Sequence, residues 1–187
     1  VLVMKDGTYL EPLDYEDPTI DSIADEYSKI RPNFDETGSP HLAGGLNIGS
    51  QLYLQFKIDP TIREKLQYVV TYPQFWGWKL TGKFATDFTS LGCHTDLWSP
   101  RNEDFSNLLK TLKIEGKIPF PKKPNELLGI LNSPMVVNGD IPKIPVSVGI
   151  HDSNASLVPH LLSQTSPFSV ISTGTWVVIL SVGGKNI

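Results

Sequence analysis

The residues best suited to chemistry lie near the C-terminus, where an apolar stretch leads to a carboxylate. Residues 144–150 read Ile-Pro-Val-Ser-Val-Gly-Ile, and His151, Asp152, Ser153 and Asn154 follow directly. The apolar stretch predicts a strand, so the carboxylate of Asp152 is expected at the end of that strand. A carboxylate in this place can accept the proton of a hydroxyl group as a general base.

A second motif consists of two apolar stretches with a turn between them. Residues 168–172 read Phe-Ser-Val-Ile-Ser and residues 176–180 read Trp-Val-Val-Ile-Leu, and the small residues Thr173, Gly174 and Thr175 separate them. The pattern predicts two strands and a tight turn. Backbone N–H groups in such a turn can hold a phosphate, although an ordinary hairpin would show the same pattern.

Helices and strands of mixed order must position these two motifs. Residues 1–10 predict a β-hairpin that turns at Asp6-Gly7. Asp17 and Pro18 are typical of a helix start, with Asp as the N-cap and Pro at the first helical position. Apolar spacing predicts further helices at 48–56, 60–66, 71–80 and 104–112 and a buried strand at 68–71.

The segment 118–145 differs from the rest of the chain because it is rich in proline. The run Pro-Phe-Pro-Lys-Lys-Pro at 119–124 is expected to be extended and stiff. We interpret this segment as a crossing between two structural units, with a domain boundary near Ile141. The strand at 146–150 is then expected to start a new sheet, and short edge strands are expected at 127–137.

Composition narrows the class of protein. Of the 187 residues, 40% are hydrophobic, which favours a folded core. The formal net charge is −4 and no basic patch stands out, which argues against nucleic acid as a partner. No apolar run is long enough to span a membrane, and no signal peptide is evident. The single cysteine, Cys93, excludes an intrachain disulfide and favours the cytoplasm. Both ends look cut, so we expect a fragment.

The order of several short motifs resembles one known family. Residues 72–90, Tyr-Pro-Gln-Phe-Trp-Gly-Trp-Lys-Leu-Thr-Gly-Lys-Phe-Ala-Thr-Asp-Phe-Thr-Ser, resemble the Leu-Thr-Gly and Thr-Asp-x-Thr segment of FGGY-type carbohydrate kinases. His-Asp-Ser-Asn at 151–154 and Ser-Thr-Gly-Thr-Trp at 172–176 follow in that family's order and look closest to its rhamnulokinase-like side. The resemblance covers roughly residues 44–182.

This resemblance implies an α/β chain with the actin-like fold, built from two ribonuclease-H-like domains with the active site in the cleft between them. Residues 1–140 would be the later part of the first, sugar-binding domain, and 141–187 the beginning of the second, nucleotide-binding domain. The family's first phosphate loop, Asp-x-Gly-Thr, is missing. Asp6-Gly7-Thr8 lacks the intervening residue, so we interpret it as the hairpin turn.

The resemblance also implies a reaction, the phosphorylation of a sugar or polyol hydroxyl by ATP with Mg²⁺. Asp152 would be the general base, and the turn at 173–175 would hold the phosphates. Residues that would contact the sugar are His151, Ser153, Asn154 and, from the first domain, Gln51. The resemblance is compatible with a homo-oligomer, and it implies that the isolated chain is inactive.

Each of these residues also has a purely structural interpretation. Asp152 could cap a helix that begins near Ser153, and this is compatible with a role as base because a helix N-terminus stabilises a carboxylate. Ser153 and Asn154 could be ordinary first-turn residues. Asp87 is expected to cap a turn, and Trp76, Trp78 and Trp98 are expected to pack in the core. Cys93 and His94 have no second ligand at metal-binding spacing, so no metal site is predicted.

Two other functions fit parts of the sequence. An actin-like ATPase of the chaperone or cytoskeletal kind would bind proteins and phosphorylate no small molecule, and the His151-Asp152 pair argues against it. A catalytically inactive, sugar-binding relative stays open, because the first phosphate loop is absent from these residues.

Overall fold

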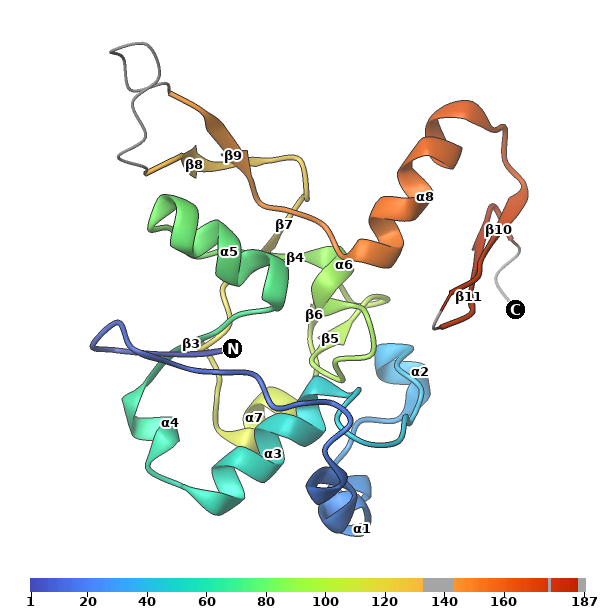
Figure 1. The fold of residues 1–187 in the computed structure, drawn as a ribbon. Helices are drawn as coiled ribbons and strands as arrows, with labels where there is room; N and C mark the ends of the chain where they lie inside the picture. The colour runs from blue at the N-terminus through green and yellow to red at the C-terminus, as the bar shows by residue number, and fades with distance from the viewer. Residues whose placement is uncertain (133–142, 175, 185–187) are drawn as a thin grey trace. The chain divides into compact units, whose positions relative to one another are not determined.

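The structure is a computed structural model that describes residues 1–132, 143–174 and 176–184. The chain divides into two compact units, Val1–Gly149 and Ile150–Ile187. Both units mix helices and strands (Figure 1). Within the described ranges, no helix has the length and apolar character needed to cross a membrane.

The first unit begins with the predicted hairpin. Strands β1 (Leu2–Met4) and β2 (Tyr9–Leu10) pair antiparallel, and β1 also pairs antiparallel with β3 (Leu66–Val69). Gly7 has a φ of 83° in the turn, a conformation that glycine adopts without steric cost. The hairpin interpretation of Asp6-Gly7-Thr8 is therefore confirmed.

Short helices make up most of the first unit. They are η1 (Pro18–Ile23), α1 (Ala24–Ser28), α2 (Phe34–Thr37), α3 (Ile48–Ile58), α4 (Ile62–Lys65), α5 (Tyr72–Thr81), α6 (Phe88–Leu91) and α7 (Leu108–Leu112). The remaining strands form three pairs: β4 (Thr86–Asp87) with β7 (Pro121–Lys122), β5 (Trp98–Ser99) with β6 (Asp104–Phe105), and β8 (Leu127–Ile130) with β9 (Pro145–Ser147).

Local capping residues set several of the helix boundaries as predicted. The side chain of Asp17 accepts a hydrogen bond of 2.8 Å from Thr19 N, and Pro18 opens η1. Helix α5 has proline in its first turn and ends at Gly82, whose φ is 72°. Gly82 N donates to Trp78 O, so the left-handed residue satisfies a terminal carbonyl.

Two expectations about helices and strands are wrong. Residues 104–105 form strand β6 instead of the start of a helix, because Asp104 pairs with Ser99 and Phe105 with Trp98. Strand β9 does not start a new sheet, since it pairs antiparallel with β8 through Ile130 and Pro145. The expected edge strands at 127–137 begin with β8, and the part from 133 onward lies outside the described residues.

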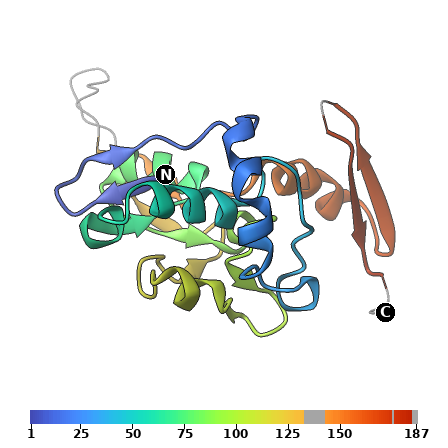
Figure 2. The same cartoon turned by 90° about the horizontal axis from the view of Figure 1, so that it is seen from below.

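Buried side chains of η1, α1, α3, β3 and α7 contribute to the main core of the first unit. Figure 2 shows the backbone of these elements turned by 90° from Figure 1. The largest fully buried side chains of this core include Tyr27, Phe56, Leu66 and Leu108. Trp98 is buried there as predicted, whereas Trp76 is 50% exposed on α5, which corrects the expectation that it packs in the core. Trp78 is half-buried and stacks on Phe84 with ring centroids 5.1 Å apart.

The second unit consists of α8 (Asp152–Ser163) and a hairpin of β10 (Phe168–Ser172) and β11 (Val178–Val182). The hairpin is antiparallel, with Ser172 opposite Val178 and Phe168 opposite Val182, which confirms the predicted strand–turn–strand pattern. Among the described residues of this unit, 150–174 and 176–184, none is buried.

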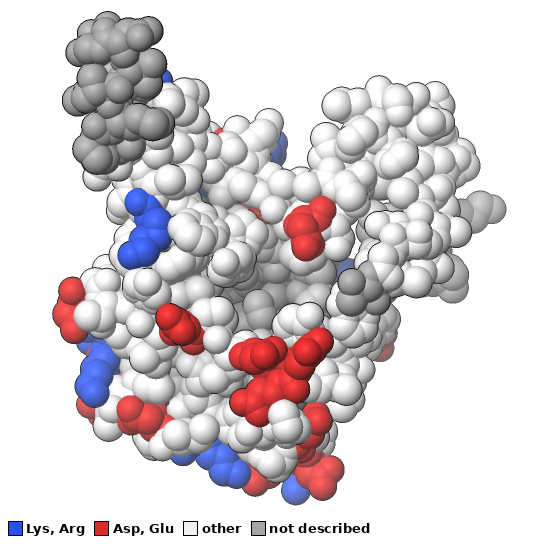
Figure 3. Space-filling view, viewed as in Figure 1, with Lys and Arg blue, Asp and Glu red and all other residues white. Residues whose placement is uncertain are grey.

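Charged side chains are unevenly spread over the face drawn in Figure 3. Acidic side chains gather over η1, α1 and the segment that precedes them. The acidic residues of these segments include Asp14, Glu16, Asp17, Asp21 and Asp25. Lysine and arginine are scattered on this face. This face therefore offers no basic patch that would favour nucleic acid.

Candidate functional site

The first turn of α8 holds four of the predicted site residues. His151 has extended backbone angles and is the N-cap of the helix, and its ring Nδ1 accepts a hydrogen bond of 3.3 Å from Ser153 N. Asp152 is the first helical residue. Strand β9 ends at Ser147, so the carboxylate lies at the start of the helix and not directly at the end of the strand.

The carboxylate of Asp152 is open to solvent and held by its neighbours. Its side chain is 92% exposed, and Oδ1 lies 3.1 Å from His151 Nδ1. Oδ1 also accepts hydrogen bonds from Ser153 N at 2.5 Å and from Ser153 Oγ at 3.3 Å. Asp152 thus assists the cap without being the N-cap residue. Such a carboxylate is accessible to a hydroxyl group and able to take its proton.

Ser153 and Asn154 follow in the same turn, and both are half-buried. The hydroxyl of Ser153 lies at the Asp152 carboxylate. The structure therefore brings His151, Asp152 and Ser153 into one hydrogen-bonded group, with Asn154 next in the turn.

The turn of the β10–β11 hairpin carries the predicted phosphate-binding residues. Thr173 and Gly174 are exposed, and Thr175 lies outside the described residues. The φ of Gly174 is not in the left-handed region, and a Cβ built there would meet no atom within 4 Å. The described chain itself therefore does not require glycine at this position. No hydrogen bond within the described part of the second unit joins Asp152 to Thr173 or Gly174.

Gln51 lies on α3 in the first unit. Its side-chain Nε2 donates to Gly45 O at 2.5 Å. Gly45 sits so close to its neighbours that an added Cβ would lie 2.4 Å from Ile20 Cδ1 and 3.3 Å from Gln51 Nε2. The amide of Gln51 is thus fixed against the loop that precedes α3.

The sequence did not reveal a buried ion pair in the first unit. Asp96 is fully buried and accepts from Arg31 Nε at 3.0 Å, Arg31 Nη2 at 2.9 Å and Tyr27 Oη at 2.7 Å. Burial, and after it the charge of Asp96, raises the pKa of the Tyr27 hydroxyl well above its ordinary value. Arg31 and Asp96 are far apart in the sequence, and no local pattern links them.

This ion pair braces a loop with unusual backbone angles. His94 and Asp96 have φ values of 38° and 66°. Asn47 Nδ2 donates to His94 O at 3.1 Å, and the ring Nδ1 of His94 lies 2.8 Å from Leu46 O. Asp87 acts elsewhere as predicted: it caps α6, and its Oδ2 accepts from Thr89 N at 2.8 Å.

Comparison with known proteins shows similarity along nearly the whole chain. No family model matches. A rhamnulokinase from Ligilactobacillus salivarius (strain UCC118) is 30% identical over 96% of this chain. The crystal structure of a carbohydrate kinase from Novosphingobium aromaticivorans is 32% identical, covers 95% of this chain and superposes with a TM-score of 0.81. A ligand-bound xylulose kinase from Lactobacillus acidophilus has a TM-score of 0.68 over 84% of the chain at 20% identity, which shows the fold alone.

The class defined by these comparisons is a mixed α/β segment with the actin-like fold of sugar kinases. The predicted resemblance to FGGY-type carbohydrate kinases is thereby confirmed, and a rhamnulokinase is among the similar proteins. The chain spans 37% of that rhamnulokinase, 39% of the carbohydrate kinase and 33% of the xylulose kinase.

Proposed function

We propose that this chain is part of a cytoplasmic, ATP-dependent carbohydrate kinase that phosphorylates a hydroxyl group of a sugar or polyol. The observation that supports this most is the similarity to a rhamnulokinase and to a carbohydrate kinase. Their sequences are 30% and 32% identical to this chain in alignments that cover 96% and 95% of it. The open carboxylate at the start of α8 supplies the chemical group that such a reaction needs.

Asp152 is the general base in this proposal. Its exposed carboxylate accepts the proton of the attacking hydroxyl, while the backbone N–H and the hydroxyl of Ser153 donate to its Oδ1. His151, Ser153, Asn154 and Gln51 are proposed contacts of the sugar, because amide, hydroxyl and imidazole groups can satisfy the hydroxyls of a polyol.

The turn at 173–175 is the proposed phosphate-binding element. ATP with Mg²⁺ would supply the phosphoryl group. The turn fits a phosphate in one respect that the structure describes: Gly174 is exposed, and the space where a Cβ would lie is empty. Gly174 itself is therefore accessible to a ligand. In this proposal residues 1–140 and 141–187 belong to the sugar-binding and nucleotide-binding domains.

Replacement of the base in the whole protein tests the proposal. Asp152→Asn is expected to lower kcat by roughly 10²–10⁴-fold, the contribution typical of a general base, with ATP binding nearly intact. Asp6→Asn is the matched control, because Asp6 is an aspartate in a hairpin turn whose Oδ1 accepts from Thr8 N. Its kcat should equal that of the wild type.

Three results would contradict the proposal. A near-normal kcat in Asp152→Asn would leave Asp152 as a structural residue of the helix start. ATP hydrolysis that no sugar or polyol stimulates would favour an actin-like ATPase. Sugar binding without phosphorylation in the wild type would favour an inactive relative.

A further inference from the structure

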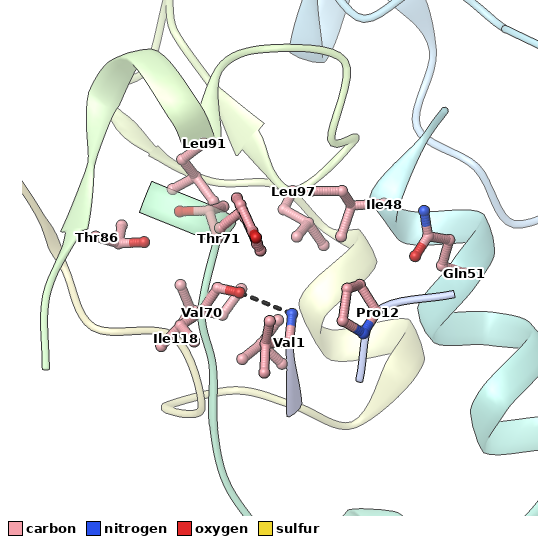
Figure 4. A pocket seen from close by; sticks show the side chains of 12 residues that line it. Val1, Pro12, Ile48, Gln51, Val70, Thr71, Thr86, Leu91, Leu97 and Ile118 are labelled. Carbon is pink, nitrogen blue, oxygen red and sulfur yellow. Dashed lines mark hydrogen bonds between the residues drawn. The ribbon is translucent and has the colours of Figure 1, made fainter. Parts of the chain in front are cut away.

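A fully buried amide side chain joins two distant segments of the first unit. Gln74 lies in the first turn of α5, and the structure leaves none of its surface exposed. Its Oε1 accepts a hydrogen bond from Thr71 Oγ1, and its Nε2 donates to Val148 O at 3.2 Å. Thr71 directly precedes α5 and also lines the small pocket drawn in Figure 4. Gln74 therefore links the start of α5 to the residue that follows β9.

Backbone hydrogen bonds hold the same two residues after β9. Val148 N donates to Glu126 O at 2.9 Å, and Gly149 N donates to Pro124 O at 3.0 Å. Val148 is buried, so its carbonyl needs a partner, and the Gln74 amide provides one. Gly149 has a φ of 97°, and a Cβ built there would lie 3.5 Å from Gln74 Nε2. The backbone at 148–149 is thus held by β8, by the loop before β8 and by α5.

Glycine at position 77 lets α5 come close enough for this contact. A Cβ built on Gly77 would lie 2.8 Å from Leu128 Cδ2 and 3.9 Å from Val148 O. The first of these distances is shorter than real Cβ contacts allow. Helix α5 therefore packs directly against β8 and β9, and the side chain of Gln74 reaches past the end of β9.

The segment that Gln74 holds leads directly to the proposed base. Val148 and Gly149 are the last residues of the first unit, and only Ile150 and His151 stand between Gly149 and Asp152. Peptide planes and bond lengths are fixed, so a segment this short passes a shift of its first residue on to its last. The backbone at Val148 is therefore the point from which the chain approaches Asp152.

We propose that Gln74 is a positioning residue for Asp152, because its amide holds Val148 O and so fixes the segment that leads to the base. The inference rests on the proposed function, in which Asp152 takes the proton of the acceptor hydroxyl. A misplacement of about 1 Å caused by a distant mutation can lower a rate about 10²-fold. Loss of the Gln74 amide should therefore slow the phosphoryl transfer step.

Steady-state kinetics of the whole protein test this role. Gln74→Met keeps the length of the side chain and removes both hydrogen bonds. We expect kcat to fall about 10²-fold, with KM for ATP close to that of the wild type. In the Asp152→Asn background the same substitution should lower kcat little further, because the base that Gln74 positions is already gone. A merely structural role would instead lower kcat by the same factor in both backgrounds.

Two more variants complete the kinetic test. Ser106→Ala is the matched control, since Ser106 is also buried and its Oγ donates to a backbone carbonyl, Asp96 O, at 2.6 Å. It should lower the melting temperature and leave kcat unchanged. Gln74→Asn keeps an amide but is one methylene shorter, so it cannot span the two partners of Gln74. It should lower kcat in the same direction, and it replaces Gln74→Met if that variant does not fold.

Hydrogen exchange in the 187-residue chain tests the structural step without ATP or turnover. The amides of Val148 and Gly149 should exchange faster in the Gln74 variant than in the wild type, relative to the amides of α3. Unchanged exchange at these two amides would overturn the inference.

Wild-type kcat in the Gln74 variant, or an equal loss of kcat with and without Asp152, would also overturn it. The single variant Asp152→Asn separates this failure from that of the proposed function. If Asp152→Asn is slow and the Gln74 variant is not, only the positioning role is wrong. If Asp152→Asn has a near-normal kcat, the proposed base itself is wrong.

Discussion

Asp96 is a buried carboxylate in a loop of the first unit that has left-handed backbone angles. It is paired with Arg31 through two hydrogen bonds and with the Tyr27 hydroxyl through a third. Its own φ of 66° lies in the left-handed region, which side chains of L residues adopt only at a cost. The ion pair therefore holds a backbone conformation that the loop would not adopt alone.

Loss of the Asp96 carboxylate should leave the Arg31 charge buried and unpaired. We expect Asp96→Ala to lower the free energy of unfolding by about 3–5 kcal/mol, the usual cost of breaking a buried pair. Urea unfolding followed by circular dichroism measures this change.

The matched control is the exposed pair of Glu26 and Lys57, with side chains 47% and 46% accessible. Lys57→Ala should change the unfolding midpoint little, because solvent and salt screen such a pair. Equal destabilisation by both variants would show that the buried Asp96 pair contributes no more to the free energy of unfolding than the exposed pair does.

Residues near each other in sequence were the ones that sequence reasoning could place. The N-cap role of Asp17 and the cap at Asp87 follow from bonds to residues two positions away. The Arg31–Asp96 pair and the buried, unpartnered hydroxyl of Thr86 depend on contacts between distant segments of the described chain. No spacing rule reports such contacts, so the sequence left both undetected.

At the scale of elements, Gly82 and Gly174 show two different reasons why glycine can occupy a position in the chain. Gly82 ends α5 with a φ of 72°, and an added Cβ would meet no atom within 4 Å. Gly174 in the hairpin turn has the same empty space but no left-handed φ. The first glycine serves the fold through its backbone angle, and the second is free to serve a ligand.

Substitution of Gly82 should therefore lower stability, whereas substitution of Gly174 should weaken ATP binding. Gly82→Ala is expected to destabilise the chain by roughly 1–2 kcal/mol, the cost of a left-handed L residue. Gly174→Val should leave the melting temperature unchanged while raising KM for ATP in the whole protein, because the side chain fills the space proposed for a phosphate. Thermal melts and ATP kinetics of both variants provide the comparison, and a normal KM for ATP in Gly174→Val would place the phosphate elsewhere.

Start and stop signals helped to predict where a helix begins and ends. Helix α5 has proline in its first turn and glycine at its C-cap, and its bounds were close to the prediction. The apolar spacing at 104–112 also predicted a helix, yet only Leu108–Leu112 is helical. The tertiary pairing of Phe105 with Trp98 decided the first residues of that stretch.

At the scale of the whole molecule, the chain corresponds to about a third of the kinases that it resembles. It spans 37% of the rhamnulokinase and 39% of the carbohydrate kinase. Within the 187 residues no Asp-x-Gly-Thr phosphate loop of the family's kind was found. A kinase also needs such a loop to hold its nucleotide.

We therefore expect the 187-residue chain alone to be inactive. Incubation with ATP, Mg²⁺ and a panel of ketoses and polyols should give no sugar phosphate above background, as measured by a coupled assay of ADP release. Turnover of any of these sugars would show that the phosphate-binding elements present here are sufficient.

The exposure of the second unit also predicts where the chain opens locally and becomes sensitive to proteases. Residues 150–174 and 176–184 include no buried side chain, and Ile171 and Ile179 of the hairpin are 64% and 67% exposed. With no fully buried apolar side chain in this unit, local opening of α8 and the hairpin costs less free energy than opening of the first unit. A protease should accordingly cut this unit first, and the surviving product should end near Gly149 and keep the cooperative melt of the first unit.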